Sequence, residues 1–306
     1  MTAPASVGRR LRFAIETGAA ATLLGLARTL PRGALYALGR SVGSLAYRFD
    51  RRHTRVALDN LTTAFGASLT ERDRRRIARA CWRHYGLITV DAAAFPRLRP
   101  QDVGTHVRYE NVEAVRSAYD EGRGVLVISG HFGHWELVAY MQGFLGMPML
   151  MITKPMQNPR LERALARVRE GSGNEVVAKE NAMRAVVKAL ARGMGVAVMI
   201  DQDARGTGIF VPFFGRPAST IPTVGAMHLR TGAAVVAVCA YPEPDDGWRL
   251  VYERLTFPGL TGDRDADVRR ITEETTAWLE GKIRQRPELW MWMHRRWKTK
   301  PPEGAR

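Results

Sequence analysis

The stretch Gly124-Val-Leu-Val-Ile-Ser-Gly-His-Phe-Gly-His-Trp-Glu136 sets the expectation for the whole chain. Its first part, Val125–Ile128, is a short apolar run that is typical of a buried strand. The polar turn over residues 129–134 leads into a predicted helix over residues 135–144. In open α/β sheets, ligands bind beyond the carboxyl ends of the strands. This turn is therefore a candidate site.

The same alternation continues toward the C-terminus. Further strands are predicted at residues 149–153, 175–178, 196–200, 234–240 and 248–255, and further helices at 158–170, 182–191 and 265–284. Strands that alternate with helices predict an α/β fold with a central, largely parallel or mixed sheet flanked by helices. We expect this domain to span residues 101–300 and to be followed by a loose tail at 301–306.

Residues 1–100 are predicted to form an N-terminal helical, membrane-associating region. The clearest helix is Glu71–Tyr85, with Ser68 or Thr70 as its N-cap and Gly86 just past its end. The apolar stretch Thr17–Ala27 has eleven residues, whereas a spanning helix needs about 20. We therefore expect one or two amphipathic helices that lie in the membrane interface. A signal peptide or an ordinary helix packed on the body would be the alternatives.

Composition limits the classes of function. The chain has 306 residues, of which 45% are hydrophobic, which argues against general disorder. Its 46 basic and 30 acidic residues give a net charge of +16, which attracts an anionic membrane surface, nucleic acid or an acidic protein. The two cysteines, Cys81 and Cys239, exclude a disulfide scaffold and a cysteine-rich metal site.

His131 is the candidate general base, and Glu136 is its candidate partner. On one regular helix they would lie about 140° apart, so they can meet only if His131 is on the turn and Glu136 in the first helical turn. A carboxylate beside an imidazole fixes its tautomer and stabilises the cation. Gly130 and Gly133 allow close backbone approach, and amides at the helix start could hold an oxyanion. A purely structural pair is the alternative.

Other chemistries have weaker support. A metal site would use His131, His134 and Glu136, or the carboxylates of Asp201 and Asp203, but the chain has no strict ligand spacing such as H-E-x-x-H. Ser129 lacks the G-x-S-x-G context of a nucleophilic serine. Neither a Walker loop nor a G-x-G-x-x-G after a strand is present, so nucleotide chemistry is unsupported.

Through this turn and four further stretches, the sequence resembles the late acyltransferases of lipid A biosynthesis. These enzymes belong with the wider glycerolipid and lysophospholipid acyltransferases. His131 and Glu136 look like the family's H-x4-D/E motif. The resemblance covers about residues 10–300. The other matching stretches are Lys154–Arg160, Asp201–Asp203, Phe210–Thr220 and Pro287–Lys298.

The resemblance implies transfer of a fatty acyl chain from a thioester to a hydroxyl of a lipid or glycolipid, without an acyl-enzyme. His131 would deprotonate the hydroxyl, Glu136 would orient His131, and an alanine at either position would abolish transfer in a folded protein. Acyl carrier protein or coenzyme A would carry the acyl group, with no metal and no other cofactor. The protein would lie on the cytoplasmic face of the inner membrane, peripherally or through one N-terminal anchor.

The predicted substrate-binding residues are Lys154, Arg160, Asp201, Gln202, Asp203, Arg205, Phe213 and Phe214. Lys154 and Arg160 would hold the phosphate or sugar of a lipid head group. The two aspartates would bind acceptor hydroxyls or pair with Arg205. The phenylalanines would line an acyl groove or a lid, with core packing as the alternative.

Two other functions stay open. A lipid hydrolase would use His131 to activate water, and a non-catalytic protein would bind anionic lipid or nucleic acid without needing His131. The mixture of aromatic and basic residues in Trp290–Trp297 is typical of single-strand binding and of membrane interfaces, and packing against the body is the third possibility. We expect a membrane surface, and no nucleic acid, as the partner.

Overall fold

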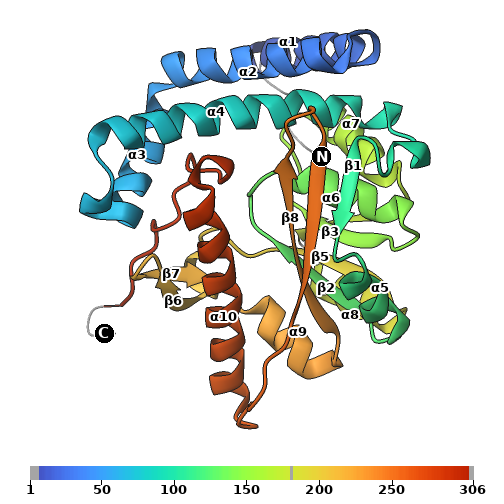
Figure 1. Cartoon of the computed structure of the whole chain (residues 1–306), viewed down its shortest axis with the longest axis vertical. Coiled ribbons are helices and arrows are strands. Elements are labelled where there is room, and N and C mark those ends of the chain that lie inside the picture. Colours follow the sequence, from blue (N-terminus) through green and yellow to red (C-terminus); the bar gives the residue numbers. More distant parts are fainter. Residues whose placement is uncertain (1–6, 180–181, 303–306) are drawn as a thin grey trace.

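A seven-stranded sheet forms the centre of the computed structural model, which describes residues 7–179 and 182–302 (Figure 1). The strands lie in the order β1 (Val107–Glu110), β9 (Trp248–Leu255), β8 (Ala234–Pro242), β2 (Val125–Ser129), β5 (Gly195–Met199), β3 (Met149–Thr153) and β4 (Glu175–Ala178). The five strands from β8 to β4 run parallel, and β9 pairs antiparallel with β8 and parallel with β1. The prediction of a largely parallel or mixed sheet is confirmed.

Helices cover the sheet, and they explain why its central strand is a continuous apolar run. All five residues of β2 are buried, as expected for a strand with helices on both faces. The helices after the first hundred residues are α5 (Glu113–Asp120), α6 (Trp135–Phe144), α7 (Pro159–Glu170), α8 (Ala182–Ala191), α9 (Thr223–Thr231) and α10 (Arg264–Gln285).

A two-stranded hairpin lies apart from the main sheet and packs against α10. It consists of β6 (Ile209–Phe213) and β7 (Arg216–Thr220). The sequence pattern did not predict it, because Pro212 and Pro217 interrupt the strand signal. The two prolines lie opposite each other in the ladder, where an isolated pair of strands tolerates missing amide donors.

The N-terminal region is helical, as predicted, and forms a layer across one end of the sheet (Figure 1). It contains α1 (Val7–Thr29), α2 (Arg32–Phe49), α3 (Arg51–Phe65) and α4 (Glu71–Ala94). Thr70 is the N-cap of α4, and its hydroxyl accepts a hydrogen bond from the amide of Asp73 at 3.2 Å. Within the described part of the chain, no helix has the length and apolar character needed to cross a membrane.

Helix α4 continues beyond the predicted end at Tyr85. Gly86 lies inside the helix, where a Cβ would be 2.3 Å from the carbonyl oxygen of Gly39 in α2. Gly43 of α2 meets α4 equally closely. Gly86 therefore serves close helix packing, and this role outweighs its usual tendency to end a helix. The predicted tail residues 303–306 lie outside the described residues.

Candidate active site

Backbone contacts fix the turn between β2 and α6. The amide of Gly133 donates to the carbonyl of Leu289, and the amide of Met291 donates to the carbonyl of His131, each at 2.9 Å. Gly133 has φ of 59°, and a Cβ there would lie 1.8 Å from the carbonyl oxygen of Ala240. Only glycine fits this position. The C-terminal segment of the chain thus holds the turn rigidly.

Asp201, and not Glu136, is the carboxylate that contacts His131. Asp201 closely follows β5, which pairs in parallel with β2, so both residues lie beyond adjacent carboxyl ends. One oxygen of Asp201 is 2.9 Å from Nδ1 of His131. The other accepts hydrogen bonds from the His131 amide at 2.7 Å and from the Trp290 indole at 2.8 Å. The Asp201 side chain is fully buried, whereas 16% of the His131 side chain is exposed.

Glu136 faces the neighbouring helix α7. The Arg169 guanidinium donates to its carboxylate at 3.0 and 2.5 Å. The structure therefore does not contain the expected Glu136–His131 contact. The start of α6 directs position 136 toward α7, away from the junction of β2 and β5. The charge of Glu136 still contributes to raising the pKa of His131.

The electrostatics of the pair suit a general base. Burial disfavours the His131 cation, but the charge and the hydrogen bond of Asp201 outweigh it and raise the pKa of His131 above 6.5. Burial also opposes ionisation of Asp201, yet its contacts with His131 hold its pKa well below the ordinary value. An ionised Asp201 selects the tautomer with hydrogen on Nδ1. The lone pair of Nε2 then points away from Asp201 and accepts a hydrogen bond from the side-chain amide of Gln202 at 3.3 Å.

The second histidine of the turn, His134, is sealed inside the protein. Its side chain has 0% exposure, and its Nδ1 accepts from the amide of Leu137 at 3.4 Å to cap α6. Its Nε2 lies 3.3 Å from the carboxylate of Asp91 in α4. Asp91 also accepts a hydrogen bond from the indole of Trp248 at 3.0 Å. His134 thus joins the turn to α4 and is shielded from solvent.

Two further histidines support the site, and no spacing pattern along the chain points to either role. Nε2 of His84 in α4 is 3.1 Å from the carbonyl oxygen of Gly133. Burial lowers the pKa of His84 to about 4, so its ring is neutral near pH 7. Nε2 of His294 is 3.1 Å from the carbonyl oxygen of Asp201. The stretch Pro287–Lys298 was noted only for its resemblance and its mixture of residues, and the structure places it against the turn between β2 and α6.

The other predicted polar residues have surroundings of their own. Asp203 accepts from the hydroxyl of Thr299 at 3.0 Å, and the alternative pairing with Arg205 is not formed. Arg205 is exposed, and its backbone carbonyl accepts from Ser219. Lys154 and Arg160 are exposed after β3 and at the start of α7, and neither side chain forms an ion pair within residues 7–179 and 182–302. Of the predicted set, the structure brings Asp201 and Gln202 to His131.

Phe213 and Phe214 are part of the core, which corrects their prediction as groove residues. They are 1% and 6% exposed. Phe213 packs edge-on against Trp290 with ring centroids 5.6 Å apart, and Phe214 contacts Trp292. Because Trp290 donates to Asp201, this aromatic cluster supports the site from behind instead of binding substrate.

Side chains that could form a covalent intermediate are already occupied or inert. The hydroxyl of Ser129 is buried and donates to the carbonyl of Val238 at 2.8 Å. Cys81 and Cys239 are buried, and burial raises the pKa of each thiol to about 12. Across residues 7–179 and 182–302, no group of three or more His, Cys, Asp or Glu residues is arranged to hold a metal ion.

Comparison with known proteins relates the chain to a family of enzymes. A family described as bacterial lipid A biosynthesis acyltransferases matches residues 9–299. A lipid A biosynthesis palmitoleoyltransferase of Escherichia coli is 30% identical over 278 residues, covering 89% of this chain and 87% of the relative. A lauroyltransferase of the same organism is 27% identical, with 92% and 91% covered. A phosphatidylinositol mannoside acyltransferase of Mycolicibacterium smegmatis is 24% identical, with 72% of each chain covered.

Proposed function

The chain belongs to the bacterial lipid A biosynthesis acyltransferase family and is an acyltransferase, and we propose that it moves a fatty acyl chain from a thioester to a hydroxyl of a lipid A-type or related glycolipid. The observation that carries the proposal is the pair of His131 and Asp201 beyond β2 and β5, in which the Asp201 side chain is buried and the His131 ring stays partly exposed. The thioester donor is an acyl carrier protein or coenzyme A.

The reaction needs one base that later acts as an acid. Nε2 of His131 takes the proton of the acceptor hydroxyl while its oxygen attacks the thioester carbonyl. The C–O bond forms, the tetrahedral intermediate collapses, and the C–S bond breaks. The thiolate then takes the proton from the His131 cation, so the products are an ester and a free thiol. Buried Asp201 stabilises that cation throughout.

Two further features support direct transfer. The amides of Trp135 and Glu136 belong to the first turn of α6, where backbone donors have no acceptor within the helix. With the side-chain amide of Gln202 they are the candidates that we propose to stabilise the oxyanion. The absence of an available nucleophile at Ser129, Cys81 or Cys239 favours attack by the acceptor itself.

The N-terminal layer supports action at a membrane surface. Helices α1 and α2 carry exposed large apolar side chains at helical spacing, and each has an arginine in its last turn, Arg28 and Arg48. Such faces bind lipid interfaces, and arginine adds attraction to anionic head groups. Asn158 of the α/β domain donates to the backbone of α1 at 3.1 Å, so this layer is attached to the reaction domain. The apolar side chains are Leu11, Ile15, Leu26, Val42, Leu45 and Phe49.

The test is a transfer assay with the purified full chain in mixed micelles. The acceptor is the total lipid extract of cells that lack the gene, and acyl carrier protein and coenzyme A thioesters are supplied in separate reactions. Mass spectrometry should find one lipid class with an added acyl chain, and thiol release should equal ester formed. Thiol release matched by free fatty acid, with or without lipid, would instead identify a hydrolase.

A further inference from the structure

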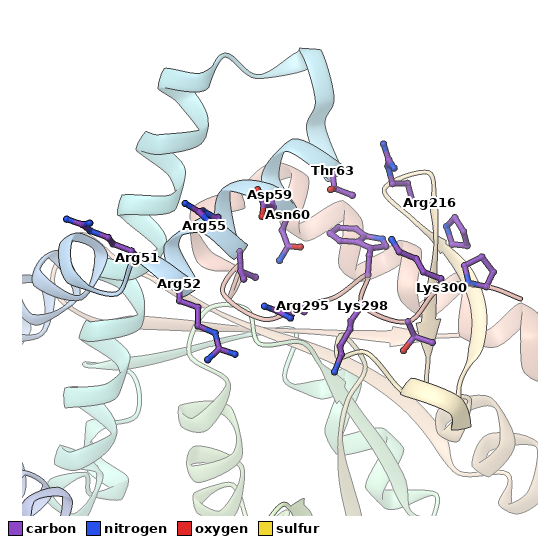
Figure 2. A pocket seen from close by; sticks show the side chains of 15 residues that line it. Arg51, Arg52, Arg55, Asp59, Asn60, Thr63, Arg216, Arg295, Lys298 and Lys300 are labelled. Carbon is purple, nitrogen blue, oxygen red and sulfur yellow. The ribbon is translucent and has the colours of Figure 1, made fainter. Parts of the chain in front are cut away.

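A large basic cavity lies between α3 and the C-terminal segment (Figure 2). Its volume is about 750 Å³, and the start of β7 forms a third side through Arg216 and Pro217. This size is within the range of pockets that hold small molecules, about 300–1,000 Å³. The cavity contains none of the residues to which the reaction has been assigned.

The lining is strongly cationic. It includes seven basic side chains and one carboxylate, that of Asp59. None of the seven forms an ion pair within residues 7–179 and 182–302. Arginines elsewhere, such as Arg249 with Glu243 at 2.8 Å, do so. Figure 2 shows Arg52 of α3 and Lys298 of the C-terminal segment extending to the same side of the cavity. The basic residues are Arg51, Arg52, Arg55, Arg216, Arg295, Lys298 and Lys300.

The wall of the cavity is continuous with the catalytic turn. Asn60 lines the cavity and donates to the carbonyls of Trp292 and His294 at 2.8 and 2.6 Å. The His294 ring contacts the backbone of Asp201, and its centroid is 6.5 Å from that of His131. A group bound in the cavity would therefore be fixed relative to the reacting atoms.

Buried Arg296 holds this wall in place. Its guanidinium donates to the carbonyl of Ser219 at 2.6 Å and to the hydroxyl of Thr220 at 2.5 Å. Its neighbours Arg295 and Trp297 line the cavity. The cationic lining is thus built on a fixed segment, which reduces the ordering cost of binding an anion.

We propose that this cavity binds a phosphate-bearing group of one of the two substrates, and this inference rests on the proposed acyl transfer. Arginine binds phosphate oxygens through two parallel hydrogen bonds, and a cluster of unpaired cations favours a multiply charged anion. A concave pocket fits a head group better than the face of an acidic protein. The phosphate belongs either to the lipid acceptor or to the thioester donor, both of which must reach His131.

The first experiment measures binding of inorganic pyrophosphate to the full chain by calorimetry. The variant R52Q/K298Q removes two cavity charges, and R72Q/R79Q removes two exposed charges of α4 outside the cavity. The cavity variant should bind at least roughly tenfold more weakly, because each lost charge-assisted contact weakens binding by about that factor or more. The control and His131→Ala should bind like the original protein. Equal binding by both double variants would overturn the proposal.

The second experiment identifies the source of the phosphate. KM is measured for each substrate, and the acceptor extract is used with and without phosphatase treatment. A rise in the acceptor KM of R52Q/K298Q that disappears with dephosphorylated lipid assigns the acceptor, and a rise in the donor KM assigns the donor. If neither KM changes, the cavity is not a substrate site. A higher KM for carrier-bound donor with unchanged pyrophosphate binding would indicate protein docking and would also overturn the proposal. If transfer itself fails, the binding experiment still decides the phosphate site.

Discussion

His131 and His134 lie in one turn, and each faces an aspartate from another part of the fold. His131 meets Asp201 beyond the carboxyl ends of β2 and β5 and keeps 16% of its side chain exposed. His134 meets Asp91 of α4 and has 0% exposure, and its other nitrogen caps α6. An aspartate partner is therefore common to both rings. The two rings differ in solvent exposure, because only the side chain of His131 is partly exposed. The comparison separates the proposed general base, His131, from a histidine that holds the turn.

The largest effect should come from His131→Ala. We expect kcat to fall by at least about 10³-fold, near the upper part of the usual range for loss of a general base. The melting temperature should fall as well, because the fully buried Asp201 loses its contact with the ring, so activity is compared below the unfolding transition. Acyl transfer and thermal unfolding measured on the same preparation check this. A folded variant that keeps a tenth of the activity would remove His131 from the mechanism.

Asp201→Asn should have the next largest effect on the reaction, roughly 10²-fold in kcat/KM, because the amide no longer fixes the tautomer or stabilises the cation. The pH profile sharpens this expectation. His131 acts as a base only when neutral, so with its pKa raised above 6.5 the rate falls on the acid side below that raised pKa. Without the carboxylate charge, this acid limb should move to lower pH. A limb that does not move would contradict the assigned pair.

Asp91→Asn tests the buried partner of the comparison. We expect a loss of about 2–4 kcal/mol in the free energy of unfolding, because the contacts of a buried carboxylate with His134 and Trp248 are weakened. The acid limb of the rate profile should stay in place, since the pair of His131 and Asp201 is intact. Urea unfolding and the pH profile of the variant measure the two quantities. A shifted limb with unchanged stability would reverse the roles of the two pairs.

Glu136→Gln should have the smallest effect. It weakens the contact with Arg169 and removes a charge that helps to raise the pKa of His131. We expect a change in kcat/KM of no more than about tenfold and a loss of about 1 kcal/mol of stability. The measurement is kcat/KM of Glu136→Gln and of Asp201→Asn under identical conditions. If Glu136→Gln is the more damaging of the two, Asp201 is not the principal partner.

The sequence by itself determined the elements with strong local signals. The buried strand Val125–Ile128 and the helix over residues 135–144 follow from apolar runs, which act over a few residues, and capping chemistry narrowed the N-cap of α4 to Ser68 or Thr70. His131 was a candidate because it follows a strand. Gly86 shows the limit of such signals, because its role depends on the distant Gly39.

Only the tertiary structure decided which groups meet at the site. Glu136 is near His131 along the chain, but the parallel pairing of β2 and β5 brings Asp201 to the imidazole, and α7 brings Arg169 to Glu136. The basic cavity likewise joins residues of α3 with residues almost 250 positions later. Glutamate and arginine side chains are long and flexible, and a carboxylate can accept from any donor that is packed beside it. Their partners are therefore set by the packing of whole elements and not by spacing along the chain.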